Sequence, residues 1–295
     1  MPSYNWSAPP FSFMDIPNPT DESCAQNDFP CLPVQFLNQL KYQMFCETDD
    51  TEFATRTIFA SIGLDCGEDG VDKVHNFNGH AYKISADGDP LKFVVNFERS
   101  SNNVFNDYAD GTCFTISIYI HVDIAPEPAY DAFQYCFSQC FFKQASGSEA
   151  NECYTTVYEY SSTSNCFGFN YQADSNFTNI IRLPTYLHSP VNVEEEKSYS
   201  KSNGVTVKLM HRIWKDFQVK VDYMPSGMLE KFTFMTAHPI LLVKDQYAGV
   251  NDFMIRQEKV DIAWQEENLP IFKMAQAKTV LRLAEPRESI SSNCI

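Results

Sequence analysis

Hydrophobic and polar residues alternate along several stretches of the chain, the pattern expected of β-strands with one buried face. The longest stretch runs from Thr112 to Val122. One of its two faces is mixed, and the other is wholly apolar, with Phe114, Ile116, Ile118, Ile120 and Val122. This pattern predicts a half-buried strand in an antiparallel sheet.

Similar runs predict further strands on both sides of this one. Their ranges are 41–46, 81–84, 91–97, 135–142, 154–160, 167–171, 217–223 and 279–283. Two more runs, 198–201 and 205–210, flank the dipeptide Asn203-Gly204. Asn-Gly supplies both positive-φ residues of a type I′ turn, so these two runs predict a β-hairpin.

One segment, 225–235, breaks the β pattern. Ser226 is a suitable N-cap, and apolar residues follow it at helical spacing. These residues are Met228, Leu229, Phe232 and Met235. We predict one short helix packed on a sheet.

The patterns together predict a mainly β fold with two antiparallel β-sandwich-like domains, one short helix and an extended N-terminal arm. Ala125-Pro126-Glu127-Pro128 has the composition of a linker between domains. We therefore expect a proline-rich arm at 1–33, an N-terminal β domain at 34–125, and a C-terminal β domain with the short helix at 129–295.

The arm differs in composition from the rest of the chain. It holds seven of the 16 prolines, and no Lys or Arg occurs before Lys41. Proline disfavours helix and removes backbone donors, so the segment is expected to be extended. Its apolar side chains need a surface, either on the chain's own body or on a neighbouring subunit. The candidate assembly residues are Trp6, Phe11, Phe13, Met14 and Ile16.

Composition supports a folded β protein. The 295 residues include 24 Phe and 15 Tyr, which favour strands, and 44% are hydrophobic. The net charge of −16 repels a phosphate backbone, so we expect no nucleic-acid partner. No run approaches the roughly 20 apolar residues of a membrane helix, so we expect no membrane insertion. The N-terminus lacks the features of a signal peptide, which predicts a cytoplasmic protein.

The ten Cys residues are expected to be reduced thiols in that compartment. A disulfide framework is the alternative, and it requires an oxidising compartment. Cys136 and Cys140 lie beside Phe in a strand-like run, which favours core thiols over a zinc site.

Motifs of catalysis and cofactor binding are absent from the sequence, including nucleophile elbows, phosphate loops and dinucleotide fingerprints. The acidic stretch 65–72 resembles a calcium loop, but Gly67 and Asn76 stand where ligands are needed. His75 and His80 offer only a weak metal hypothesis. We expect no enzyme activity, no catalytic residues, no cofactor and no metal.

Two other groups have a functional and a structural interpretation. Tyr154, Tyr158 and Tyr160 fall on one face of a predicted strand, where they either form core or stack on sugars. Glu194-Glu195-Glu196 is interpreted as a solvated run, because an acid–base pair needs one carboxyl in an apolar pocket.

Seven segments of the chain carry motifs that are distinctive in combination: 111–116, 153–160, 166–171, 181–187, 199–204, 221–224 and 292–294. Together they resemble a recurring pattern in proteins encoded by phages and prophages of the Bacteroidota. The likeness covers about 91–295 and leaves out the N-terminal arm. It departs at the acidic insert 194–196 and at Trp214.

The resemblance implies a structural virion protein, a tail, baseplate or connector-ring subunit that assembles in multiple copies. Its implied partners are other copies of itself and other virion proteins, in a particle assembled in the host cytoplasm. The family offers no catalytic residues to carry over. The alternative is a tail-tip protein that binds a receptor or a host-surface glycan.

Overall fold

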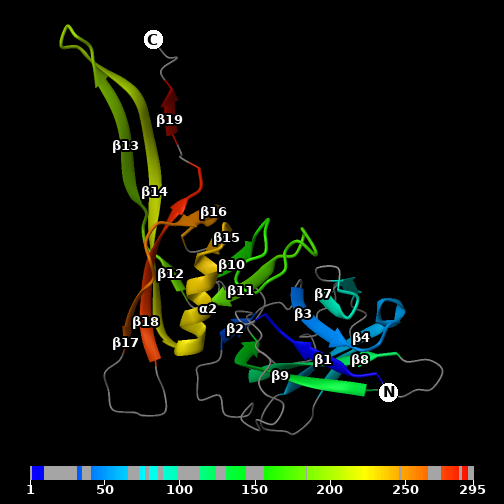
Figure 1. The fold of residues 1–295 in the computed structure, drawn as a ribbon. Helices are drawn as coiled ribbons and strands as arrows, with labels where there is room; N and C mark the ends of the chain where they lie inside the picture. The colour runs from blue at the N-terminus through cyan, green and yellow to red at the C-terminus, as the bar shows by residue number, and fades with distance from the viewer. Residues whose placement is uncertain are drawn as a thin grey trace. The chain divides into compact units, whose positions relative to one another are not determined.

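The computed structural model describes thirteen stretches of the chain, in which it is mainly β with one α-helix (Figure 1), as predicted. The described residues are 2–9, 32–34, 41–65, 73–76, 80–85, 89–98, 113–123, 131–143, 156–183, 185–245, 248–264, 274–285 and 288–291.

The chain divides into two compact units, at boundaries that differ from the predicted ones. Unit 1 comprises Met1–Asn151 and Ser161–Leu183, and unit 2 comprises Glu152–Tyr160 and Pro184–Ile295. The expected linker at 125–128 lies outside the described residues, and the strands that flank it pair with each other in one sheet, with Val122 opposite Asp131.

Unit 1 contains two sheets. The first has the order β1-β3-β7-β6, formed by Tyr4–Ser7, Lys41–Thr48, Lys92–Glu98 and His80–Ser85. The second has the order β2-β9-β8-β4-β5, formed by Leu32–Val34, Asp131–Lys143, Cys113–Val122, Ile58–Asp65 and Lys73–Asn76. The described strand pairs of these two sheets are antiparallel except β2 with β9, which are parallel. Two sheets in one unit fit the predicted sandwich-like architecture.

Phe53 lies at the centre of the first sheet's core. It belongs to a short 3-10 helix, Phe53–Thr55, and is fully buried. Ring centroids of Tyr4, Trp6 and Phe93 lie 5.6, 6.1 and 4.6 Å from its own. Aromatic contacts of this kind add to the burial of apolar area. Strand β1 is therefore part of the core of unit 1.

A polar contact also attaches β1 to unit 1. The hydroxyl of Tyr4 donates to Oδ2 of Asp50 over 2.7 Å, and Nε of Arg56 donates to the same oxygen over 3.0 Å. Burial raises the pKa of Asp50, but these hydrogen bonds outweigh it and hold the pKa below its usual value. The start of the arm, Tyr4–Ser7, thus packs on its own body.

The predicted strand at 167–171 was wrong. Phe167 and Gly168 have φ of 51° and 78°, which breaks an extended backbone. The rings of Phe169, Tyr171 and Phe177 nevertheless lie 5.7 to 6.3 Å apart and are buried. The aromatic pattern there indicated burial and not a strand.

Unit 2 is built on one sheet whose order includes β10-β15-β16-β18-β14-β12. β13 and β19 also pair with β14, and β17 pairs with β18. The helix α2, Ser226–Thr236, lies against β14 and β18 (Figure 1). The strands are β10 Thr156–Ser161, β12 Thr185–Leu187, β13 Val191–Ser200, β14 Thr206–Pro225, β15 Ile240–Asp245, β16 Val250–Arg256, β17 Asp261–Trp264, β18 Met274–Leu283 and β19 Glu288–Ser291. β11, Asn179–Leu183, belongs to unit 1.

The helix was predicted correctly, and its buried side chains follow the predicted spacing. Leu229, Phe232 and Met235 are each at most 1% exposed. The ring of Phe232 meets that of Tyr158 edge-on, with centroids 6.3 Å apart. Within the part of the chain that the structure describes, no helix is long and apolar enough to cross a membrane.

Candidate functional site

A long β-hairpin, residues 191–216, projects from the sheet of unit 2 (Figure 1). It consists of β13 and the first half of β14. The pairing of the two strands begins with Val191 opposite Asp216 and ends with Ser200 opposite Thr206. The second half of β14, from Asp216 to Pro225, pairs with β18. One strand of 20 residues therefore lies half in the sheet and half in the hairpin.

The turn at the tip of the hairpin differs from the predicted type I′ turn. Gly204 has a φ of 80°, but Asn203 does not have a positive φ. The amide of Gly204 donates to the carbonyl of Lys201 over 2.9 Å, and the amide of Lys201 donates to the carbonyl of Val205 over 2.8 Å. The loop thus has three residues, with glycine in the left-handed position. The side chain of Asn203 instead accepts from the amide of Val205 over 3.1 Å.

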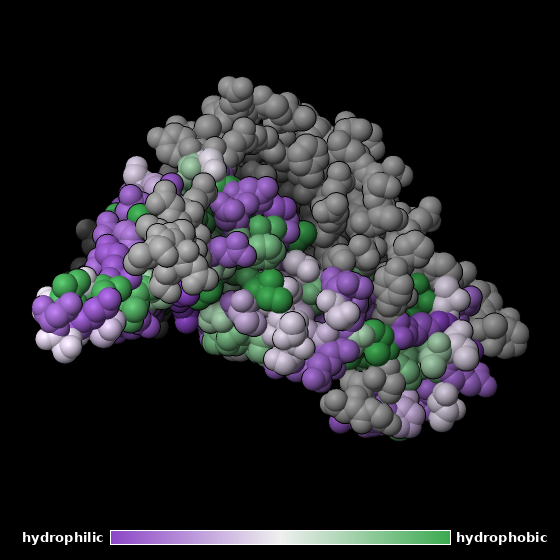
Figure 2. Space-filling view, turned by 90° about the horizontal axis from the view of Figure 1, so that it is seen from above, coloured by the Kyte–Doolittle hydropathy of each residue, from purple (hydrophilic) through white to green (hydrophobic). Residues whose placement is uncertain are grey.

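Apolar side chains of the hairpin are exposed to solvent. Tyr199 is 49% exposed, Val205 52% and Leu209 46%. At the left of Figure 2, the end of the hairpin mixes hydrophobic and hydrophilic residues. A two-stranded hairpin is marginally stable by itself because it lacks a buried face. This hairpin therefore exposes apolar area that a second surface is able to bury.

The hairpin differs in charge from the rest of the chain. It has five Lys and Arg against four Asp and Glu, a net charge of +1, in a chain whose net charge is −16. The end of the hairpin, 197–212, contains four cations and no carboxylate. The ion pair between Lys208 and Glu196, at 2.9 Å, is exposed and contributes little stability. The end of the hairpin thus carries a more positive net charge than the rest of the chain.

An ion pair lies where the hairpin leaves the sheet. Nε and NH2 of Arg282 on β18 donate to the two carboxylate oxygens of Asp216, over 2.6 and 2.8 Å. The guanidinium also lies 5.6 Å from the ring centroid of Trp214. The hydrogen bond with Asp216 raises the pKa of Arg282, so the guanidinium stays charged. A planar two-point contact restricts geometry, and this one fixes the root of the hairpin to β18.

The arm residues expected to carry assembly are only partly described. Trp6 is half-buried in β1 and contacts Phe53 of its own unit. Phe11, Phe13, Met14 and Ile16 lie outside the described residues. An interaction of 10–31 with a neighbouring subunit stays a prediction.

The two described residues of the tyrosine stripe belong to the core, so these two rings are not available to stack on sugars. Tyr158 is fully buried and its hydroxyl lies 2.6 Å from the hydroxyl of Thr185. Tyr160 is 3% exposed, and its ring meets that of His238 at 4.8 Å. Burial lowers the pKa of His238 to about 4, so this imidazole is neutral at pH 7. Tyr154 lies outside the described residues.

The two histidines of the metal hypothesis lie in different sheets. His75 belongs to β5 and His80 to β6, and most of the acidic stretch, 66–72, lies outside the described residues. Among the residues described, no group of three or more His, Cys, Asp or Glu is placed to hold a metal ion.

Among the described residues, Cys46 and Cys166 form no disulfide, and the reduced state of the ten Cys residues stays a prediction. Burial raises the pKa of Cys46 to about 12, so it is protonated and unreactive at neutral pH.

Sequence reasoning missed the hairpin as a functional site. The sequence predicted a hairpin from 198–201 and 205–210, and Glu194 to Glu196 were interpreted as a solvated run. The charges of Glu194 to Lys197 fall on both faces of β13, so this strand has no continuous apolar face. The missing apolar face indicated that this strand does not cover a core, because a strand that covers a core needs one apolar face.

No protein-family model matches the chain, and a comparison with curated proteins gives no significant match. The properties of the hairpin, together with the resemblance described above, are therefore the basis for a functional proposal.

The ion pair at the root predicts how the hairpin responds to substitution. In Asp216→Asn, Arg282 loses a charged partner at a half-buried position. Amides of 211–217 should then exchange with solvent roughly 10 to 100 times faster, corresponding to about 1.5–3 kcal/mol. Hydrogen exchange measured by mass spectrometry tests this.

The control is Lys278→Gln, which removes an exposed ion pair with Asp261 at 3.4 Å. It should leave exchange in the hairpin unchanged. Equal exchange in Asp216→Asn and the wild type would show that the ion pair does not hold the hairpin.

Proposed function

We propose that the chain is a structural subunit of a phage virion, a tail, baseplate or connector-ring component that assembles in multiple copies. The observation that carries the proposal is the projecting hairpin, 191–216, whose apolar side chains are exposed. The virion setting comes from the resemblance to phage and prophage proteins of the Bacteroidota. The hairpin provides the means of assembly.

Burial of the hairpin on a neighbour would supply substantial stabilisation. Each large apolar side chain that becomes fully buried contributes about 1.5–3 kcal/mol. Tyr199, Val205 and Leu209 are each about half exposed, so they retain a large part of that contribution. Their burial requires no rearrangement of the core of unit 2, because the hairpin lies beyond the contact with β18.

The hairpin also has a strand edge suited to assembly. Within the described ranges, β13 pairs with β14 alone. Its other edge therefore presents backbone donors and acceptors, which a strand of a partner is able to pair with. The charged residues Glu194 to Lys197 on this strand limit nonspecific pairing, as natural edge strands commonly do.

The alternative of a receptor- or glycan-binding tail-tip protein receives less support. Its candidate surface for stacking on sugars was the tyrosine stripe, and the two described members, Tyr158 and Tyr160, lie in the core. The assembly role is therefore the one that the described surface favours.

Shortening the hairpin tests the proposal. Replacing 198–209 with Asn-Gly joins Lys197 to Met210, which are opposite each other. The variant keeps the root ion pair and the pairing of β14 with β19, but removes Tyr199, Val205 and Leu209. Size-exclusion chromatography with light scattering should show multi-copy assemblies for the wild type and a monomer for the variant.

The matched control is Leu91→Ser, which removes a 39% exposed apolar side chain from unit 1 and should leave assembly unchanged. Undiminished assembly of the shortened variant, or a wild type that stays monomeric at high concentration, would contradict the assembly role.

The virion setting has a separate test. Mass spectrometry of purified phage particles from the source bacterium should detect the chain as a constituent, in a constant ratio to the other structural proteins. Intact particles that lack it would contradict the virion assignment and leave the assembly role standing.

A further inference from the structure

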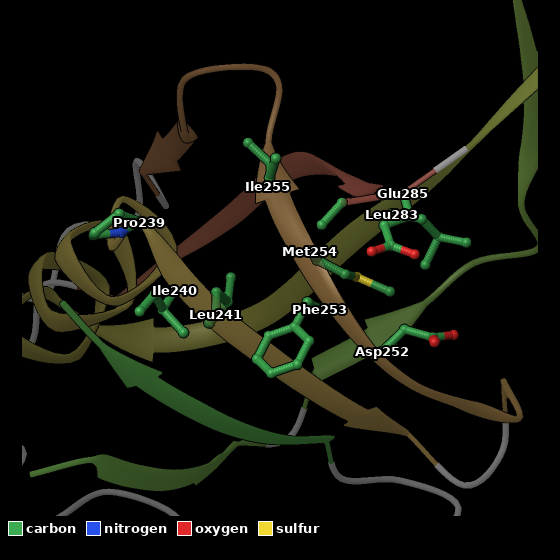
Figure 3. Close-up of a pocket in the computed structure, with 10 residues that line it drawn as sticks. Pro239, Ile240, Leu241, Asp252, Phe253, Met254, Ile255, Leu283 and Glu285 are labelled. Atoms are coloured by element: carbon green, nitrogen blue, oxygen red, sulfur yellow. The ribbon is translucent and has the colours of Figure 1, made fainter. Parts of the chain in front are cut away.

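A shallow depression of about 590 Å³ lies in unit 2, across β15, β16 and the end of β18 (Figure 3). Its apolar lining includes Ile240, Phe253 and Ile255, and Asp252 and Glu285 also line it. Lys and Arg are absent from its lining among the described residues. The depression thus joins apolar surface to negative charge.

The exposed residues of β16 belong to one face of that strand. Val250 and Met254 are buried in the core of unit 2, whereas Phe253 is 55% and Ile255 49% exposed. A strand that covers a core with one face ordinarily presents polar residues on the other. Two large exposed apolar side chains on neighbouring outward positions are therefore typical of a contact surface.

The end of the hairpin has the complementary properties. It carries the exposed side chains of Tyr199, Val205 and Leu209 among four cations and no carboxylate over 197–212. We propose that the hairpin end of one copy docks in the depression of a second copy of this chain. This inference rests on the proposed function, because it names the partner of the same hairpin.

One copy cannot fill its own depression with its own hairpin. The hairpin is rooted at Asp216 and Arg282 and projects away from β15 and β16 of the same sheet (Figure 1). A second copy offers the same depression, and the chain outside the hairpin carries a net charge of −17. That charge attracts the positive end of an approaching hairpin and repels a nucleic acid.

The contact joins two different surfaces, so it is heterologous. Contacts of this type produce a closed ring when the rotation between copies closes, and an open filament when it does not. Each copy uses its hairpin toward one neighbour and its depression toward the other. In a head-to-tail assembly of this kind, two variants that each lack one of the two surfaces should bind each other but should not assemble further.

The test combines two variants that each lose one surface. The first lacks 198–209, as described above, and keeps the depression. The second, Phe253→Asp, places a charge in the depression and keeps the hairpin. Phe253 is half exposed, so this change should not prevent folding; Phe253→Ser is the milder second variant. Ile262→Asp, at a 36% exposed position on β17, is the matched control.

Each variant alone should associate at least about tenfold more weakly than the wild type. Mixed in equal amounts, the two should form a one-to-one dimer that grows no further, seen by light scattering or native mass spectrometry. Ile262→Asp should assemble like the wild type.

Other outcomes separate this inference from the proposed function. If the shortened variant fails to assemble but Phe253→Asp and Phe253→Ser assemble normally, the hairpin docks elsewhere and the inference is overturned while the proposed function stands. If the mixture forms no dimer, the inference is likewise overturned. If the wild type is monomeric and its hairpin binds duplex DNA instead, both are overturned.

Discussion

The structure of unit 2 depends on a single long strand that changes its surroundings halfway along. From Asp216 to Pro225, β14 has β18 beside it and a core beneath it. From Thr206 to Lys215 it belongs to a hairpin without a core. A strand gains most of its stability from the packing of one face. The sheet obtains this packing from α2, and the hairpin needs another surface to pack against. The ion pair between Asp216 and Arg282 lies at this transition and holds the exposed half to the packed half.

The local pattern of apolar residues predicted much of the fold, because a side chain's direction in a strand alternates with sequence position. It located β8 and α2 well. It failed at 167–171, where aromatic residues are buried around a turn with positive φ. The error arises because alternation and composition describe a segment by itself and do not show which segment it pairs with.

The same limitation explains why the candidate site was not predicted. The depression combines β15 and β16 with the end of β18, and its exposed Phe253 and Ile255 alternate with buried residues as in any strand. Only the structure shows that their face is uncovered. The proline-rich segment received the assembly role instead, since its apolar residues have no core of their own. At its start, Tyr4 is fixed to Asp50, so that part contributes to folding.

Two surfaces of opposite character on one chain provide a simple physical basis for assembly: a positive, apolar hairpin end and a negative, apolar depression. An electron cryo-microscopy map of the assembled protein tests this account most directly. The account predicts density for each hairpin end against β15 and β16 of the next copy. A map in which copies contact one another through other surfaces, with every hairpin end in solvent, would contradict it.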